Sequence, residues 1–216
     1  MEIERIPLGI AELDRILGGG LPPGTTVLLG GEPGVGKSTF LLQIAASLAR
    51  RFPVLYASGE EAPALVRERA GRIGALEERL FFLPERSLIG ILKATRKVGA
   101  RALFVDSVQT VFPGMEHSAG SPQGIRTTVA MILEFVRAEA SIAFLSAQVN
   151  KRSRVYGPRA LEHLVDVSFL LEYGKGERVL KVLKNRYGPA GLSLALRMEG
   201  KGLTFSNCSW AYRATA

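Results

Sequence analysis

The residues with the clearest chemical meaning form a glycine-rich stretch near the start of the chain. Residues 31–38 read Gly-Glu-Pro-Gly-Val-Gly-Lys-Ser, which fits the phosphate-loop pattern G-x-x-x-x-G-K-[ST]. In such a loop the backbone N–H groups turn toward the phosphates, Lys37 adds a cation, and the Ser38 hydroxyl is the expected protein ligand of Mg²⁺. The predicted ATP-binding residues are Gly31, Glu32, Pro33, Gly34, Val35, Gly36, Lys37, Ser38 and Thr39.

A carboxylate suited to the magnesium site follows a second apolar stretch. Residues 103–105 are Leu-Phe-Val, and Asp106 comes directly after them. Because ligands of α/β proteins bind at the carboxyl ends of the strands, we expect Asp106 to orient Mg²⁺ through water. An Asp that follows an apolar strand is, taken alone, more often a helix cap or a turn residue. The presence of a phosphate loop in the same chain favours the metal role.

Hydrolysis also needs a group that polarises the attacking water. Glu60 and Glu61 follow another short apolar stretch, and Glu60 is the predicted general base. Whether Glu61 shares this role stays open; the alternative is that the pair caps a helix beginning near Ala62, where carboxylates suit the helix dipole. Gln148, after a further apolar stretch, is expected to sense the γ-phosphate and pass its state to the loop that follows.

Alternating strands and helices must position these residues. The apolar pattern predicts strands over 25–30, 54–58, 80–83, 102–106 and 142–146. Between them, helical spacing predicts helices over 40–49, 62–73, 88–98 and 122–140. After residue 164 the pattern becomes β, with strands expected over 165–173, 178–184, 193–198 and 203–206. This order predicts an α/β fold with a mainly parallel twisted sheet, helices on both faces and antiparallel strands added at one edge.

The composition predicts a soluble globular protein. With 216 residues and 47% hydrophobic content, the chain suits one domain, residues 1–216. No apolar run approaches the roughly 20 residues that span a bilayer, and Glu2 and Glu4 stand where a signal peptide would be basic. A single cysteine excludes an internal disulfide and a four-cysteine zinc site. We therefore expect a cytoplasmic protein with no membrane partner.

The positive charge is concentrated late in the chain. The formal net charge is +8, and residues 148–190 hold nine Lys/Arg against four Asp/Glu. A basic segment of this kind favours a polyanionic partner, bound through phosphate contacts and counterion release. An ordinary solvated basic surface is the alternative, and charge alone does not separate the two.

Several motifs together resemble one family, the bacterial RadA/Sms recombination ATPases of the RecA superfamily. The resemblance covers most of the chain and rests on residues 9–20, 58–61, 105–110, 157–166 and 184–189. The last of these, Lys-Asn-Arg-Tyr-Gly-Pro, is similar to the family's K-N-R-F-G motif with Tyr for Phe. The resemblance implies a RecA-like P-loop ATPase core that hydrolyses ATP.

The same resemblance implies an assembly and a partner. Proteins of this family form rings, usually hexamers, with ATP at the subunit interfaces, and they load on single-stranded DNA to drive branch migration. The resemblance implies that Lys184 and Arg186 reach the γ-phosphate of a neighbouring subunit, and that a recombinase is a possible further partner. A cation supplied in trans would stabilise transition-state charge. The alternative is that both residues merely belong to a basic hairpin tip.

Two loops are expected to face the channel of such a ring, residues 112–123 and 149–159. The second is the better candidate for DNA, since its cations suit a phosphate backbone and its tyrosine suits stacking on a base. The predicted DNA-binding residues are Lys151, Arg152, Arg154, Tyr156 and Arg159. These side chains are otherwise ordinary solvated residues.

This sequence differs from the family's pattern in several features, and these differences leave alternative functions open. The family carries a four-cysteine zinc module and a Lon-protease-like domain, and we expect this sequence to represent the ATPase core alone, as a core-only paralogue or as part of a longer protein. Gln148 replaces an expected histidine, and Arg152 and Ser153 replace an acidic–glycine pair. The leading hypothesis is a DNA-stimulated ATPase of recombination and repair. The alternatives are a KaiC-like regulatory ATPase or autokinase without DNA, and a non-catalytic module that binds ATP only to assemble.

Overall fold

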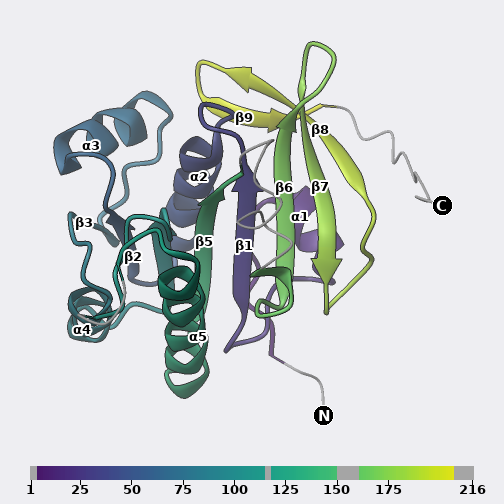
Figure 1. The fold of residues 1–216 in the computed structure, drawn as a ribbon. Helices are drawn as coiled ribbons and strands as arrows, with labels where there is room; N and C mark the ends of the chain where they lie inside the picture. Colours follow the sequence, from purple (N-terminus) through teal and green to yellow (C-terminus); the bar gives the residue numbers. More distant parts are fainter. Residues whose placement is uncertain (1–3, 115–117, 150–160, 207–216) are drawn as a thin grey trace.

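The computed structural model describes residues 4–114, 118–149 and 161–206, which form one nine-stranded sheet with helices on both faces (Figure 1). The strand order across the sheet is β3-β2-β4-β5-β1-β6-β7-β8-β9. The first six strands in this order pair in parallel, and the last three are added antiparallel. The expected sheet with an antiparallel extension at one edge is confirmed.

The parallel part brings the predicted chemical residues to one edge. Its strands are β3 (Leu80–Leu83), β2 (Val54–Ser58), β4 (Ala102–Asp106), β5 (Ile142–Gln148), β1 (Thr26–Gly31) and β6 (Val167–Tyr173). Ser58 pairs with Asp106, and Gly31 pairs with Gln148, at the carboxyl ends of these strands. The register therefore places the phosphate loop, the β2 loop and the ends of β4 and β5 side by side.

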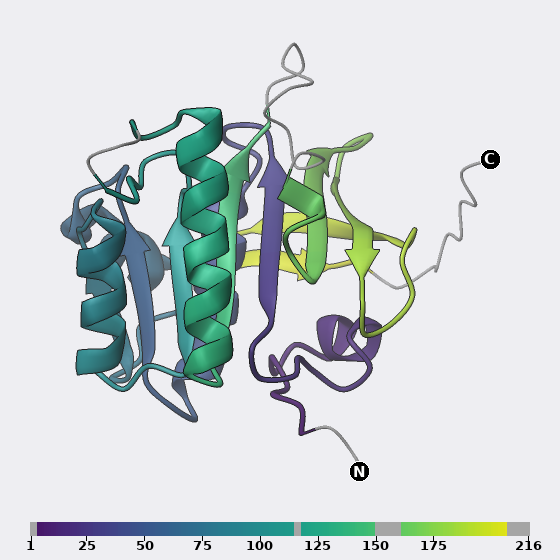
Figure 2. The same cartoon turned by 60° about the horizontal axis from the view of Figure 1, so that its bottom comes forward.

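Two apolar layers pack against the sheet. On one face lie α4 (Leu88–Lys97) and α5 (Pro122–Ala138), which stand next to each other in Figure 2 and bury Ile91, Val129 and Ile132. The other core contains α1 (Ala11–Ile16), α2 (Lys37–Ala49) and α3 (Pro63–Arg72). The strands between them are buried on both sides; all residues of β1, β2 and β4 are buried. The sheet is thus a rigid base for the loops at its edge.

The antiparallel extension is tied back to the helix after the phosphate loop. Its strands are β7 (Arg178–Asn185), β8 (Ser193–Glu199) and β9 (Gly202–Phe205). Gln43 of α2 bonds both backbone groups of Leu203, with its Nε2 donating to the carbonyl over 3.0 Å and its Oε1 accepting from N–H over 2.9 Å. The β8–β9 hairpin therefore lies against α2 and not only against the sheet.

The structure differs from the sequence expectations at a few boundaries. Helix α2 begins at Lys37 and not at residue 40, because Gly36 takes φ +114° as its N-cap and the polar first turn hides the helical periodicity. Strand β5 runs on to Gln148, paired with Gly31. Helix α1 was not expected; Asp14 stabilises the backbone just before it by accepting from the N–H groups of Leu8 and Gly9. Within the described residues, no helix is long and apolar enough to cross a bilayer.

Candidate active site

The phosphate loop connects β1 to α2 through glycines that the local backbone requires. Gly34 and Gly36 have φ of +78° and +114°, in the region that L side chains rarely adopt. A Cβ on Gly31 would lie 2.5 Å from the carbonyl oxygen of Leu171 on β6. These three positions therefore require glycine for the loop to keep this backbone.

Lys37 lies in the first turn of α2 and is 8% exposed. Its Nζ donates to the carbonyl oxygens of Gly31 and Glu32 over 2.8 and 2.9 Å. Burial lowers the pKa of Lys37 from its ordinary value of 10.5, and the carboxylates of Asp106 and Glu60 oppose this shift. The ammonium thus sits between backbone dipoles and two acidic groups, where an anionic ligand would find a partly desolvated cation.

Asp106 ends β4 and is held from two sides in the protein interior. Its Oδ2 accepts from the Tyr56 hydroxyl over 2.8 Å, and its Oδ1 accepts from the Ser146 hydroxyl. Burial and the Asp106 charge raise the pKa of Tyr56 well above 10.0, so the phenol remains a donor. Since both carboxylate oxygens are engaged, Asp106 fits a role in orienting the water shell of a metal better than direct ligation.

The residues present fit a magnesium ion that arrives with a nucleotide. Mg²⁺ keeps several waters and takes few protein ligands, and the Ser38 hydroxyl and Asp106 face the same cavity. The part of the chain that the structure describes contains no group of three or more His, Cys, Asp or Glu side chains that would hold a metal by itself. The phosphates would therefore have to supply much of the coordination.

Glu60 stands in the loop after β2, exposed and facing the same cavity. Two donors reach its Oε1: the Ser107 hydroxyl over 2.6 Å and Gln148 Nε2 over 3.1 Å. Ser107 is buried just after the strand that carries Asp106, whereas Gln148 is exposed at the end of β5. The structure thus brings Glu60 and Gln148 together beside β4, the strand that ends at Asp106.

Glu61 has a different set of partners. Its Oε1 accepts from Arg69 Nη2 over 2.5 Å, and its N–H donates to the Ser58 hydroxyl over 3.4 Å. Helix α3 begins after Ala62 without a side-chain cap. The alternative that the acidic pair caps this helix is therefore wrong, since Glu61 reaches along α3 to Arg69 and Glu60 points toward Ser107.

A cavity of about 290 Å³ collects these groups. From the phosphate loop and α2 it is lined by Pro33, Gly34, Gly36, Lys37, Ser38 and Thr39. The facing wall is made by Glu60, Glu61, Arg69, Asp106, Ser107 and Gln148, and Met198 of β8 completes the lining beside Gly36. Of the predicted nucleotide-binding residues, Gly31, Glu32 and Val35 do not line the cavity; Gly31 and Glu32 offer their carbonyls to Lys37 instead.

Two residues at neighbouring ends of β6 and β7 hold the backbone of the phosphate loop, which the sequence did not predict. The Tyr173 hydroxyl donates to the carbonyl of Gly34 over 3.0 Å, and Arg178 Nε donates to the carbonyl of Val35 over 2.9 Å. The Arg178 guanidinium also lies over the Tyr173 ring at 5.6 Å. These contacts join residues about 140 positions apart, so no local sequence pattern could indicate them.

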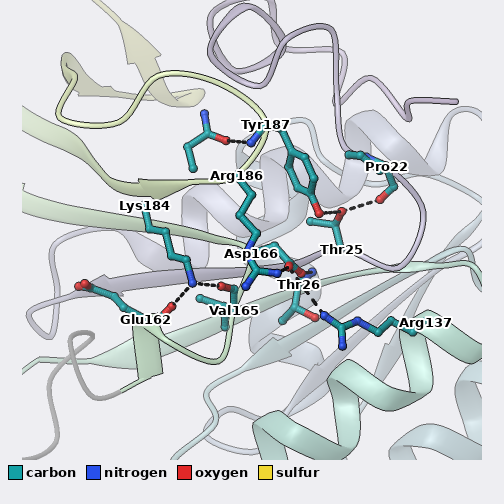
Figure 3. Close-up of polar contacts among 11 residues, drawn as sticks. Pro22, Thr25, Thr26, Arg137, Glu162, Val165, Asp166, Lys184, Arg186 and Tyr187 are labelled. Carbon is teal, nitrogen blue, oxygen red and sulfur yellow. Dashed lines mark hydrogen bonds and ion pairs between the residues drawn. The ribbon is translucent and has the colours of Figure 1, made fainter. Parts of the chain in front are cut away.

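Lys184 and Arg186 lie near the amino-terminal end of β6, whereas the phosphate loop lies at the carboxyl ends of the parallel strands. Lys184 on β7 pairs with Ser168 near the start of β6, and its Nζ donates to the carbonyls of Glu162 and Val165, both over 2.7 Å (Figure 3). Burial, and then the charge of Arg186, lower the pKa of Lys184 from 10.5. The nucleotide cavity of the same chain has neither residue in its lining.

Arg186 is fixed by a buried carboxylate. Its Nη1 donates to Asp166 Oδ1 over 2.9 Å, while Asp166 Oδ2 accepts from the N–H of Thr26 over 3.0 Å. The Asp166 side chain is 3% exposed and that of Arg186 is 52% exposed, with Arg137 approaching the same carboxylate at 4.0 Å (Figure 3). Arg186 is thus held at its guanidinium but presented to solvent.

The residues between and after these cations anchor the N-terminal segment. Asn185 Nδ2 donates to the carbonyl of Ile16 over 3.0 Å, and a Cβ on Gly188 would lie 2.2 Å from that same oxygen. The Tyr187 hydroxyl lies 3.1 Å from the Thr25 hydroxyl, and the Arg5 guanidinium lies over the Tyr187 ring, 5.9 Å from its centroid. The 184–189 motif therefore has a structural part in addition to its exposed cations.

The predicted DNA-binding residues Lys151, Arg152, Arg154, Tyr156 and Arg159 lie outside the described residues. The structure does describe where that segment leaves the sheet: β5 ends at Gln148, and the N–H of Val149 donates to the carbonyl of Gly31 over 3.1 Å. The segment after Gln148 therefore starts beside the phosphate loop.

Comparison with known proteins finds similarity to a KaiC family model and to proteins named RadA. A family model for the KaiC ATPase matches residues 6–81. "DNA repair protein RadA" of Aquifex aeolicus is 42% identical over 208 residues, and that of Pseudomonas aeruginosa is 39% identical over 206 residues. Each alignment covers 94% of this chain but 46% and 45% of the relatives, so the chain spans about half the length of the curated relatives it matches.

A solved structure shows the same fold. A KaiC-like protein, PH0186, from Pyrococcus horikoshii superposes with a TM-score of 0.78 at 20% identity, covering 95% of this chain and 100% of that one. The expected RecA-like α/β fold and the resemblance to RadA are thus confirmed.

Proposed function

We propose that this chain, a member of the RadA family that corresponds to the ATPase core of its relatives, hydrolyses ATP with Mg²⁺ under the control of single-stranded DNA. Its cellular role would be in recombination and repair, since the relatives are named DNA repair proteins. The observation that carries the proposal is the position of Glu60, held by Ser107 and Gln148 on the wall that faces the phosphate loop.

Each residue of the cavity has a part that follows from its contacts. Lys37 would exchange the carbonyls of Gly31 and Glu32 for phosphate oxygens, which offset its charge better than carbonyl dipoles. Ser38 and Asp106 would hold Mg²⁺, which supplies charge neutralisation between the phosphates. Glu60 would orient a water and accept its proton; among the described residues both hydrogen bonds to its carboxylate go to Oε1.

The positions of Lys184 and Arg186, away from the phosphate loop, suit a role between subunits. Lys184 and Arg186 are too far round the sheet to serve the nucleotide of their own chain, yet both are fixed and partly open to solvent. A homo-oligomeric ring that places this edge against the phosphate loop of the next subunit would complete the site with two cations. Hydrolysis would then depend on assembly.

DNA control would enter through Gln148. This residue contacts Glu60 and directly precedes the segment that contains Lys151, Arg152, Arg154, Tyr156 and Arg159. A nucleic acid bound to that segment would alter the hydrogen bond between Gln148 and Glu60, the proposed general base, without contacting the bound ATP. Basic side chains and one tyrosine are the usual means of binding a single strand.

Phosphate release with and without single-stranded DNA at low salt tests the proposal. We expect Mg²⁺-dependent hydrolysis that DNA stimulates, no nucleotide binding for Lys37→Ala, and retained binding with roughly 10²- to 10⁴-fold slower turnover for Glu60→Gln. A wild-type chain that releases no phosphate under any of these conditions would be an assembly module, and the proposal would be wrong.

A regulatory ATPase or autokinase of the KaiC type is the second candidate. It is favoured by the KaiC family model over residues 6–81. The two candidates differ in their acceptor: a KaiC-like function predicts hydrolysis insensitive to DNA, or phosphate transferred to the protein. Mass spectrometry of the chain after incubation with ATP, beside the DNA-stimulation assay, separates them.

A further inference from the structure

Arg69 of α3 is a second cation in the nucleotide cavity, on the wall that faces Lys37 and the phosphate loop. Its side chain is 23% exposed, and its Nη2 donates to Glu61 Oε1 over 2.5 Å. This hydrogen bond and the charge of Glu61 raise the pKa of Arg69 above its ordinary value, although partial burial opposes the shift. Arg69 is therefore a fixed, charged group at the acidic end of the cavity.

The charge balance of the cavity indicates that Arg69 offsets more negative charge than that of Glu61 alone. Three carboxylates line the cavity, those of Glu60, Glu61 and Asp106, against two cations, Lys37 and Arg69. A triphosphate would add further negative charge beside the three acids. Lys37 comes from the phosphate-loop side, and among the described residues that line the cavity Arg69 is the one cation on the side of the acids.

The guanidinium has unused hydrogen-bonding capacity. It carries five N–H donors in a planar fork, and among the described residues its hydrogen bond goes to one oxygen of Glu61. A fork of this kind matches phosphate oxygens, which a lysine contacts only as a point charge. Glu61 fixes one side of the fork and leaves other donors for a ligand of the cavity.

We propose that Arg69 binds the γ-phosphate of ATP within the same subunit, with Glu61 as the residue that positions it. Arg69 then distinguishes ATP from ADP, and Glu61 does not share the role of the base. The inference rests on the proposed function, since it takes ATP as the ligand of the cavity.

Equilibrium binding of a non-hydrolysable ATP analogue and of ADP to the full chain tests this role. We expect Arg69→Met to raise the Kd of the ATP analogue about tenfold or more and to leave the Kd of ADP within about twofold. Arg69→Lys, which keeps the charge but not the fork, should fall between the two and serves if Arg69→Met does not fold. Equal changes for both nucleotides, or no change, would overturn the proposal.

The variant Glu61→Gln/Arg69→Met separates phosphate contact from simple neutralisation of Glu61. We expect its affinity for the ATP analogue to remain as low as that of Arg69→Met; recovery to the wild-type value would mean that Arg69 only offsets Glu61. Arg72→Met, an exposed arginine on the same helix, is the matched control and should bind both nucleotides normally. A wild-type chain that binds both nucleotides but does not hydrolyse ATP would contradict the proposed function and leave the Kd comparison valid.

Discussion

Gln148 Nε2 donates to Glu60 Oε1 over 3.1 Å and so joins the ends of two strands that are not neighbours in the sheet. Glu60 follows β2 and Gln148 ends β5, with β4 between them. The backbone carbonyl of Gln148 also accepts from Nε2 of Gln109, in the loop after β4, over 3.3 Å. Gln148 is therefore the described residue that links the predicted base to the segment predicted to bind DNA.

Replacement of Gln148 tests this link. Gln148→Leu removes one of the two donors to Glu60 but leaves Ser107 in place. We expect kcat to fall roughly tenfold, as for the loss of one hydrogen bond to a charged group, and DNA to lose its stimulating effect, while the KM for ATP stays unchanged. Steady-state kinetics with and without single-stranded DNA measure this.

Gln109→Ala is the matched control, because Gln109 touches the backbone of Gln148 and not Glu60. It should keep most of the basal turnover. If Gln148→Leu remains fully stimulated by DNA, the signal does not pass through this hydrogen bond.

Much of the site was predictable because strand ends are local features and a parallel sheet collects them at one edge. The phosphate loop, Asp106 and Glu60 each follow an apolar stretch, and the structure brings them to one cavity. Gln148 and Glu60 were predicted separately, and only the strand order β2-β4-β5 and the hydrogen bond across it show that they meet.

The remaining site residues depend on packing that a single sequence does not reveal. Tyr56 and Ser146 hold Asp106 because β2 and β5 flank β4, which is a matter of strand order. Arg69 faces the cavity because of the way α3 lies on the sheet. Tyr173 reaches the phosphate loop only through the pairing of β6 with β1.

Mixing two inactive variants tests the role of Arg186 between subunits. Glu60→Gln lacks the base but offers the cations, whereas Arg186→Ala lacks one cation but keeps the base. If the site is shared, an equal mixture should regain about a quarter of the wild-type turnover, since one interface in four combines both intact halves. Phosphate release after co-refolding or subunit exchange measures this.

The same experiment with Arg137→Ala in place of Arg186→Ala is the control. Arg137 approaches Asp166 only at 4.0 Å, so this variant should be active by itself. A mixture of Glu60→Gln and Arg186→Ala that gains nothing beyond the sum of its parts would place Arg186 in a structural role.

The lowered pKa of Lys37 predicts a pH dependence of nucleotide binding. Burial favours the neutral amine, so the folded chain releases this proton below the ordinary value of 10.5. A triphosphate binds the charged form, and ATP affinity should therefore begin to fall at a pH below 10.5. In Glu60→Gln the fall should begin at lower pH still, because the Glu60 carboxylate raises the pKa of Lys37.

The sign for stability follows from the same shift. Between the lowered pKa of Lys37 and 10.5, the unfolded chain holds the proton that the folded chain has lost, so the free energy of unfolding rises with pH across that window.

Calorimetric titration with ADP from neutral pH to about pH 10 measures the effect of pH on nucleotide binding. An affinity that stays flat throughout would show that Lys37 keeps an ordinary pKa.

The Tyr56 hydroxyl is expected to support Asp106 more than any exposed phenol supports its partner. Tyr56→Phe removes the donor to Oδ2 but keeps the ring, which stacks on Phe104 with centroids 6.0 Å apart. Because Asp106 is only 8% exposed, water replaces that donor poorly, and we expect a loss of about 1–3 kcal/mol in the free energy of unfolding. Tyr173→Phe loses the bond to Gly34 at a site that is 55% exposed, and should cost less than about 1 kcal/mol. Chemical denaturation of both variants compares their free energies of unfolding. The Mg²⁺ concentration for half-maximal hydrolysis should rise for Tyr56→Phe alone, because only this change removes a hydrogen bond to the Asp106 carboxylate.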